Sequence, residues 1–348
     1  MKDMPDEFVP PCEKRRIDID VLRLYAITIV TSFHLARWLG YDNLTFLNPL
    51  KIVFTEGAGI GVYMFFAISG YCLAMRYDDS MSYGKFLGTR LLRIVPTYWT
   101  AIAIWCVLVS AGVSCASIGI KDVLCHILFV HVFFPDTFFS VNGVFWFLGD
   151  IMQLYLFFPV LFWICRRWFG GIALAVVPFG ITLWLVKGCG VVYPGFAKSS
   201  LMYMTPFIAG MLLCMHPVKI RWRTAKVVLL VMSVALFFVK IPWLYGEVAR
   251  QAKTILFVFG VLQFKDELTC MPCGMAKTVN AIAASSFSIY LYNYIFYAGR
   301  PGQRNGWVLL CFLGMVFGFG AIMHSLIERP LNSLVKKIVT RHTRTPAS

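Results

Sequence analysis

The sequence has little charge for its length: 14% of its 348 residues are Asp, Glu, Lys or Arg, whereas 59% are hydrophobic. Soluble domains are about 25% charged, so this shortage excludes a chain that folds wholly in water. Segments of about ten residues that alternate apolar and polar positions are also missing, which excludes a transmembrane β-barrel. The sequence instead contains apolar runs of about 18 residues or more, each long enough to cross a bilayer as a helix. We therefore predict an all-α membrane protein with several spans.

Acidic residues are the scarcer of the charged residues, with 17 Asp and Glu against 32 Lys and Arg and a net charge of +15. No polar stretch is long enough to form a soluble basic surface, which excludes nucleic-acid binding. A basic excess is typical of cytoplasmic loops and of contact with anionic lipid. We therefore expect the lipid bilayer, and no nucleic acid, as a partner.

Metal-ligand clusters and a secretion signal are absent from the sequence as well. Most of the 11 cysteines lie inside apolar runs, and the pair Cys270 and Cys273 supplies only two ligands. No metal site is therefore expected. The apolar run that follows Arg16 lacks a small-residue cleavage site, which predicts an uncleaved first span.

The apolar runs predict about ten transmembrane helices. The segment near 122–134 has too few apolar residues to span and is expected to be re-entrant or interfacial. If this segment does not cross, most basic loops lie on one face, which places both termini in the cytoplasm and the chain in the cytoplasmic (inner or plasma) membrane. The expected spans are 18–39, 57–76, 94–113, 144–165, 171–188, 200–215, 226–244, 248–264, 279–298 and 306–327. The expected divisions are a cytoplasmic segment at 1–16, a membrane domain at 17–332 and a basic cytoplasmic tail at 333–348.

The first expected span carries two ionisable residues, Arg23 and His34. A charged residue inside a bilayer costs about 2.5–3.5 kcal/mol and usually marks function. The two residues are 11 positions apart, close to three helical turns, so they share a face at a separation of about 16 Å. The alternative is an arginine that snorkels to the interface and a histidine that only packs. Two such residues on one face favour a functional site.

Three polar residues of other spans are expected at the depth of His34, namely Asp150, Asn293 and Glu56. An acid beside a histidine fixes the imidazole tautomer and stabilises the imidazolium, and Asp150 is the candidate for this role. Asn293 and Glu56, together with Trp146 at the start of the same span as Asp150, are candidates for binding an acceptor.

A pair of arginines, Arg90 and Arg93, stands at the expected start of the third span. Residues three apart share a helix face, and guanidinium groups are planar, bidentate donors suited to phosphate. The alternative is a pair of anchors at the cytoplasmic surface.

These segments together resemble the acyltransferase 3 family of membrane O-acyltransferases. The resemblance covers about residues 17–332. It rests on Arg23-x10-His34, Phe65-Phe66-Ala-Ile-Ser69-Gly70, Arg90-x-x-Arg93-x-x-Pro96, Ser286-Phe287-Ser288-Ile289-Tyr290-Leu291-Tyr292 and Glu328-Arg329-Pro330. The sequence departs from the family where many members have a tryptophan and a histidine, here Tyr292 and Asn293. It departs again where many have acidic residues, here Ile151 and Met152.

The resemblance implies transfer of an acyl group from cytoplasmic acyl-CoA, usually acetyl-CoA, to a hydroxyl of a cell-envelope or exported glycan or a lipid-linked sugar. Arg90 and Arg93 would bind the donor, and Ser69 lies nearby with backbone shaping as its alternative role. His34 would act as general base or form a transient acyl-histidine, and Arg23 would bind the donor or stabilise negative charge.

Two other function classes stay open from the sequence. Polar groups at matched depth also suit a membrane transporter or flippase for a glycan or lipid precursor, although the two halves show no inverted repeat. A scaffold without catalysis fits the departures at Asn293, Ile151 and Met152. The acceptor, the length of the acyl group and the formation of a homo-oligomer are not determined by the sequence.

Overall fold

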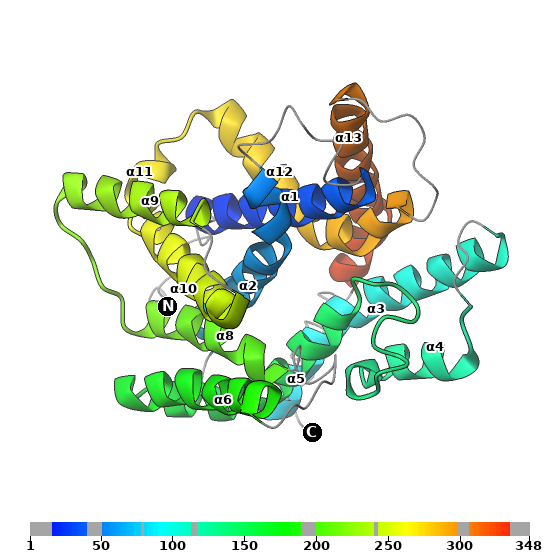
Figure 1. Ribbon diagram of the computed structural model, residues 1–348, viewed down its shortest axis with the longest axis horizontal. Coiled ribbons are helices and arrows are strands. Elements are labelled where there is room, and N and C mark those ends of the chain that lie inside the picture. Colours follow the sequence, from blue (N-terminus) through cyan, green and yellow to red (C-terminus); the bar gives the residue numbers. More distant parts are fainter. Residues whose placement is uncertain are drawn as a thin grey trace, which may run out of the picture.

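The computed structural model describes residues 16–39, 51–77, 80–112, 117–188, 200–239, 243–297 and 306–334. For 51–58, 182–183, 185–188, 243–246 and 306–310 only the backbone is described. Within these ranges the chain is helical and has no β-strand (Figure 1). The N-terminal segment and most of the basic tail expected from the sequence lie outside the described residues.

The long helices follow the apolar runs of the sequence. They are α1 (Ile17–Leu39), α2 (Lys51–Arg76), α3 (Tyr83–Ser110), α5 (Trp146–Cys165), α6 (Trp168–Gly188), α8 (Ser200–Met215), α9 (Arg223–Phe237), α10 (Trp243–Leu262), α12 (Cys273–Tyr292) and α13 (Gly306–Met323). Shorter elements are α4 (Ile120–Ile127), η3 (His131–Phe133), α11 (Lys265–Thr269), η4 (Asn293–Tyr297) and η5 (His324–Glu328).

The start of the third helix differs from the prediction. α3 begins at Tyr83, not at 94, because Ser82 caps it: the Ser82 hydroxyl accepts a hydrogen bond from the backbone N–H of Lys85 over 3.4 Å. The polar first turns then continue into the apolar run without a break. Arg90 and Arg93 therefore lie well inside the helix and not at its end.

Five helical stretches of the described residues are long and apolar enough to cross a bilayer: 17–38, 59–76, 83–110, 146–165 and 311–334. The helices at 168–181 and 200–215 are apolar but shorter. These lengths and compositions show a helical membrane protein. The count of about ten spans stays a prediction.

The segment near 122–134 forms α4 and η3, and the 8 residues of α4 are too few to span a bilayer. Its two histidines are fully buried and stacked, with ring centroids 3.9 Å apart. Nδ1 of His126 donates to the Asp122 carbonyl over 3.0 Å, and Nε2 of His131 donates to the Phe145 carbonyl over 3.2 Å. The stacked pair joins the short helix to the residue before α5.

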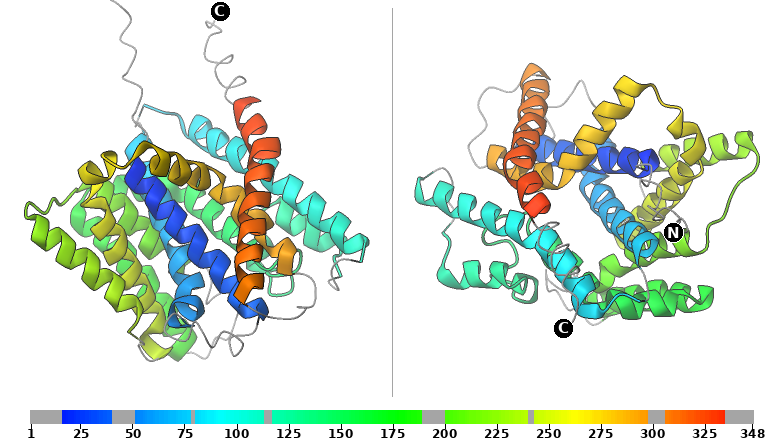
Figure 2. Two further views of the ribbon diagram at one scale, coloured as in Figure 1. Left: turned by 90° about the horizontal axis from the view of Figure 1, so that it is seen from above. Right: turned by 180° about the vertical axis from the view of Figure 1, so that it is seen from behind.

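The centre of the bundle is a close crossing of α2 and α8 (Figure 2). A Cβ on Gly70 would lie 2.0 Å from the Phe207 carbonyl oxygen, and one on Gly210 would lie 1.9 Å from the Ala67 carbonyl oxygen. Only glycine allows the two backbones to approach this closely. α1 packs along α2 and α12, so the crossing positions the helix that carries Arg23 and His34.

Candidate functional site

The start of α1 is fixed to the end of α2 by Arg16. Its guanidinium pairs with the buried Asp18 at 2.5 Å, donates to the Tyr71 hydroxyl over 3.1 Å and lies over the Tyr71 ring. One turn further along α1, Asp20 is buried, and an oxygen of its carboxylate lies 3.9 Å from a nitrogen of Arg23. These contacts set the rotation of α1 about its axis.

Arg23 points from α1 toward α2 and α3. Its guanidinium lies 3.8 Å from the sulfur of Cys72, and it is close enough to Arg93 to act on the charge of that residue. Arg90 and Glu328 also lie within electrostatic range of Arg93. The structure thus gathers Arg23, Arg90, Arg93 and Glu328, which we call the Arg23 cluster.

The arginines of this cluster differ in exposure. The Arg93 side chain is exposed, whereas Arg23 and Arg90 are half-buried. Three groups of other elements and Arg90 of the same helix act on the charge of Arg93. Arg90 lies over the ring of Phe86, and its Nε has no hydrogen-bond partner among the described residues. Guanidinium groups with free donors are suited to phosphate or carboxylate.

Ser69 lies at the edge of the Arg23 cluster. Its hydroxyl accepts a hydrogen bond of 3.4 Å from Tyr155 of α5, and Tyr155 lies within electrostatic range of Arg93. The neighbouring Gly70 forms the backbone crossing described above. The Ser69-Gly70 pair therefore has a packing role, with Ser69 beside the arginines.

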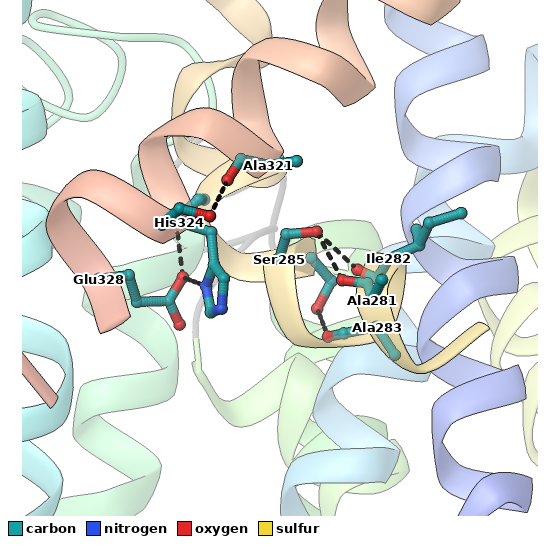
Figure 3. Close-up of polar contacts among 10 residues, drawn as sticks. Ala281, Ile282, Ala283, Ser285, Ala321, His324 and Glu328 are labelled. Atoms are coloured by element: carbon teal, nitrogen blue, oxygen red, sulfur yellow. Dashed lines mark hydrogen bonds and ion pairs between the residues drawn. The ribbon is translucent and has the colours of Figure 1, made fainter. Parts of the chain in front are cut away.

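Glu328 is the member of the cluster that was not among the candidate site residues, although the Glu-x-Pro pattern contains it. It is 5% exposed, and one of its oxygens lies 2.8 Å from Nδ1 of His324 (Figure 3). The same oxygen accepts a 2.7 Å hydrogen bond from Ser288 of α12. A carboxylate this deeply buried in an apolar helix is costly unless it is paired. The cost of a carboxylate in the last apolar run is the sequence signal that could have identified Glu328.

His34 lies further along the same helix among aromatic rings. Its imidazole meets the Tyr294 ring edge to face, with centroids 5.9 Å apart, and Tyr294 lies 6.2 Å from the ring of Trp105 on α3. Asn293 precedes Tyr294 and is 1% exposed. We call His34, Trp105, Asn293 and Tyr294 the His34 cluster.

Asn293 is held from within its own helix. Its Nδ2 donates to the Tyr290 carbonyl over 2.6 Å, and its Oδ1 has no hydrogen-bond partner among the described residues. A buried amide oxygen without a partner is costly. It is therefore a candidate acceptor for a hydroxyl of a bound molecule.

The other candidates expected at the depth of His34 belong to the first two turns of α5 and α2. Asp150 is fully buried within electrostatic range of Tyr203 and Tyr290. Trp146 is half-buried, with its ring 5.2 Å from Tyr203. The pairing of Asp150 with His34 stays a prediction, and the side chain of Glu56 lies outside the described residues.

No three His, Cys, Asp or Glu side chains come close enough to hold a metal ion in the described part of the chain. What the arrangement offers is two kinds of chemistry on one face of α1. The Arg23 cluster can bind an anion, and the imidazole of His34 can move a proton in surroundings of low polarity.

The structure defines a helical membrane protein in which one helix face carries both a cluster of arginines and a histidine. Residues 16–324 match the family model described as an acyltransferase domain. The chain therefore belongs to the acyltransferase 3 family, as the sequence motifs indicated. It is also 28% identical over 193 residues to nodulation protein 10 of Rhizobium leguminosarum bv. viciae. That match covers 49% of this chain and about half of the relative, 51% of its length. No solved structure matches the chain significantly.

Proposed function

We propose that the protein is a membrane O-acyltransferase that moves an acyl group, most simply acetyl, from acyl-CoA to a hydroxyl of a cell-envelope or exported glycan. One observation carries the proposal: Arg23 and His34 share a face of α1, and each meets its own cluster. The clusters are separated by three helical turns, about 16 Å. An anionic carrier bound at one level can present its acyl group at the other.

The Arg23 cluster is the proposed donor site. The phosphates of CoA would bind Arg93, which is exposed, and Arg90, which is half-buried and whose Nε has no hydrogen-bond partner among the described residues. Arg23 is the arginine of the cluster that shares a face of α1 with His34. From there it would guide the extended pantetheine arm and carry part of the negative charge that develops on the thioester oxygen.

The His34 cluster is the proposed reaction site. His34 would take the proton of the acceptor hydroxyl as its oxygen attacks the thioester carbonyl carbon. The C–O bond forms, the C–S bond breaks, and the proton passes to the leaving thiolate. Asn293 Oδ1 and the ring of Trp146 are the proposed contacts for the acceptor, because polar amides and flat aromatic rings bind sugars from the edge and the face. Asp150 is proposed to support the imidazolium through the neighbouring tyrosines.

A cytoplasmic donor needs the Arg23 cluster on the cytoplasmic side of the inner or plasma membrane. We propose ten spans with both termini on that side. The start of α1 and the end of the last helix, in dark blue and red, lie toward the same side of the bundle in the left view of Figure 2. This arrangement agrees with an even number of spans, and the basic residues of the loops favour the cytoplasmic orientation.

The experiment that tests this function uses the full chain purified in detergent or nanodiscs with acetyl-CoA labelled in the acetyl group. We expect slow release of labelled acetate from acetyl-CoA and transfer of the label to glycan from membranes of the source cell. Uptake of unmodified glycan into vesicles without any consumption of acetyl-CoA would instead support a transporter. Loss of acetyl-CoA turnover in an Arg23→Ala variant is the expected companion result.

A further inference from the structure

Glu328 is held in an unusual backbone element. η5, which contains it, is a π-helical turn in which the N–H of Arg329 bonds the carbonyl of His324, five residues back. π-helical turns are rare and occur frequently at functional sites. The turn places the His324 ring beside the Glu328 carboxylate (Figure 3).

Two donors meet on one oxygen of this carboxylate. Ser288 Oγ and His324 Nδ1 lie 2.7 Å and 2.8 Å from Oε2, and Oε1 takes neither bond. The carboxylate is 6% exposed and the His324 side chain 21% exposed. Glu328 is therefore shielded, whereas part of the His324 side chain reaches the surface of the bundle.

The groups that face Glu328 come from three elements. Ser288 and Tyr292 belong to α12, Arg93 belongs to α3, and His324 belongs to η5 itself. Arg93 in turn repels Arg23 and Arg90. One carboxylate thus lies beside three guanidinium groups, so the cluster has a surplus of positive charge.

We propose that Glu328 and His324 form the counter-ion of the arginines in the Arg23 cluster, and that this pair takes up a proton when an anion binds the cluster. The inference rests on the proposed donor site. Without a bound anion, Glu328 balances part of the arginine charge. An anion adds negative charge beside Glu328 and His324, so the pair takes up a proton and becomes imidazolium and carboxylate. By linkage, the affinity for the anion then rises as the pH falls.

The test is titration calorimetry of the purified full chain with CoA and, separately, with inorganic pyrophosphate. Repeating each titration at pH 7 in two buffers of different ionisation enthalpy gives the number of protons taken up. The wild-type protein is expected to take up more protons than His324→Gln, by up to about one per anion. Protonation of the ligand itself cancels in this difference. Ser288→Ala, which changes no charge, is the matched control and should keep the uptake.

A second variant separates the counter-ion from a ligand role. Glu328→Gln removes the negative charge beside the anion, so it should bind pyrophosphate several-fold more tightly at pH 8 than the wild type and lose most of the pH dependence. Weaker binding by Glu328→Gln, with an unchanged melting temperature, would overturn the proposal. Equal proton uptake by the wild type and His324→Gln would overturn it as well.

The inference and the proposed function can fail independently. If neither CoA nor pyrophosphate binds the wild type, the counter-ion is wrong, and acetyl-CoA turnover still reports on acyl transfer. If pyrophosphate binds with proton uptake and acetyl-CoA is never consumed, the counter-ion stands and the acyltransferase proposal is wrong.

Discussion

The Arg23 and His34 clusters lie on the same face of α1 but contain different kinds of side chain. The Arg23 cluster contains three guanidinium groups and a carboxylate, which is hydrogen-bonded to Ser288 of another helix and to His324 of its own turn. The His34 cluster contains mainly rings in edge contact and one buried amide. In the proposed function, this difference separates binding from chemistry: charge gathers where an anion would be held, and low polarity surrounds the histidine that would move a proton, where each remaining dipole acts more strongly.

The largest expected effect is that of a substitution at His34. His34→Ala should lower acetyl transfer by about 10²–10⁴-fold, the usual contribution of a general base, while the affinity for CoA stays unchanged because the Arg23 cluster is intact. Turnover of labelled acetyl-CoA and direct CoA titration measure the two quantities. Arg37→Ala, at an exposed position of the last turn of α1, is the control. Full transfer activity in His34→Ala would remove the histidine from the mechanism.

At the other cluster the effect should be on binding. Arg90→Ala combined with Arg93→Ala should weaken CoA binding by about tenfold or more for each arginine, since a hydrogen bond to a charged group contributes about 1.5–3 kcal/mol. Transfer at saturating donor should fall much less. The pair Arg166→Ala and Arg167→Ala removes the same charge from an exposed loop and serves as the control. Equal loss in both double variants would show that overall charge, not the cluster, attracts the donor.

Substitutions at the adjacent residues Gly70 and Ser69, beside the Arg23 cluster, should differ in their effect on stability. Gly70→Ala should lower stability by about 1–3 kcal/mol or more, because its Cβ would overlap the Phe207 carbonyl oxygen. Ser69→Ala removes one long hydrogen bond and should cost about 1 kcal/mol or less. Thermal unfolding in detergent compares the two variants. A Gly70→Ala protein as stable as Ser69→Ala would mean that α2 and α8 do not cross this closely.

A pH-dependent loss of stability is expected at the buried histidine pair, His126 and His131. Burial lowers the pKa of His126 to about 4, and burial together with the neighbouring His126 lowers the pKa of His131 to about 3. The unfolded segment binds protons below about pH 6.5, so the stability that these histidines allow is complete above that pH and is lost as the pH falls. Between pH 7.5 and 5.5 the loss should be about 1.4 kcal/mol for each histidine.

Amide hydrogen exchange of residues 120–145 at several pH values measures this loss. A variant with His126→Phe and His131→Phe keeps the stacked rings and should show a flatter pH profile. An unchanged profile in that variant would assign the acid sensitivity to other groups.

Much of the fold followed from the sequence because the bilayer restricts the choice. Apolar length predicted α8 at 200–215 and placed both ends of α1, α5, α6 and α13 within four residues of those observed. At least one end of α2, α9, α10 and α12 differs by five to seven residues. The prediction was wrong at the start of α3, since the polar turns from Tyr83 lie outside the apolar run and depend on the Ser82 cap. Apolar length cannot detect such a polar extension.

The site was predictable only where one helix contains both residues. The phase of α1 placed Arg23 and His34 on one face, and the spacing of Arg90 and Arg93 predicted a shared face on α3. Which helices meet was not predictable, because contacts between distant segments depend on packing that no local pattern encodes. Tyr294 beside His34, and Ser288 and His324 around Glu328, are contacts of this kind.

The sequence by itself determined the solvent of this protein, the positions of its long helices and its family, since apolar length, charge bias and short motifs are local properties of the chain. The tertiary structure decided that Arg23, on the first helix, meets arginines of the third and, through them, a carboxylate near the end of the last. Two backbone features bring these distant side chains together. The glycines let α2 and α8 cross closely, and the π-helical turn widens the last helix at Glu328.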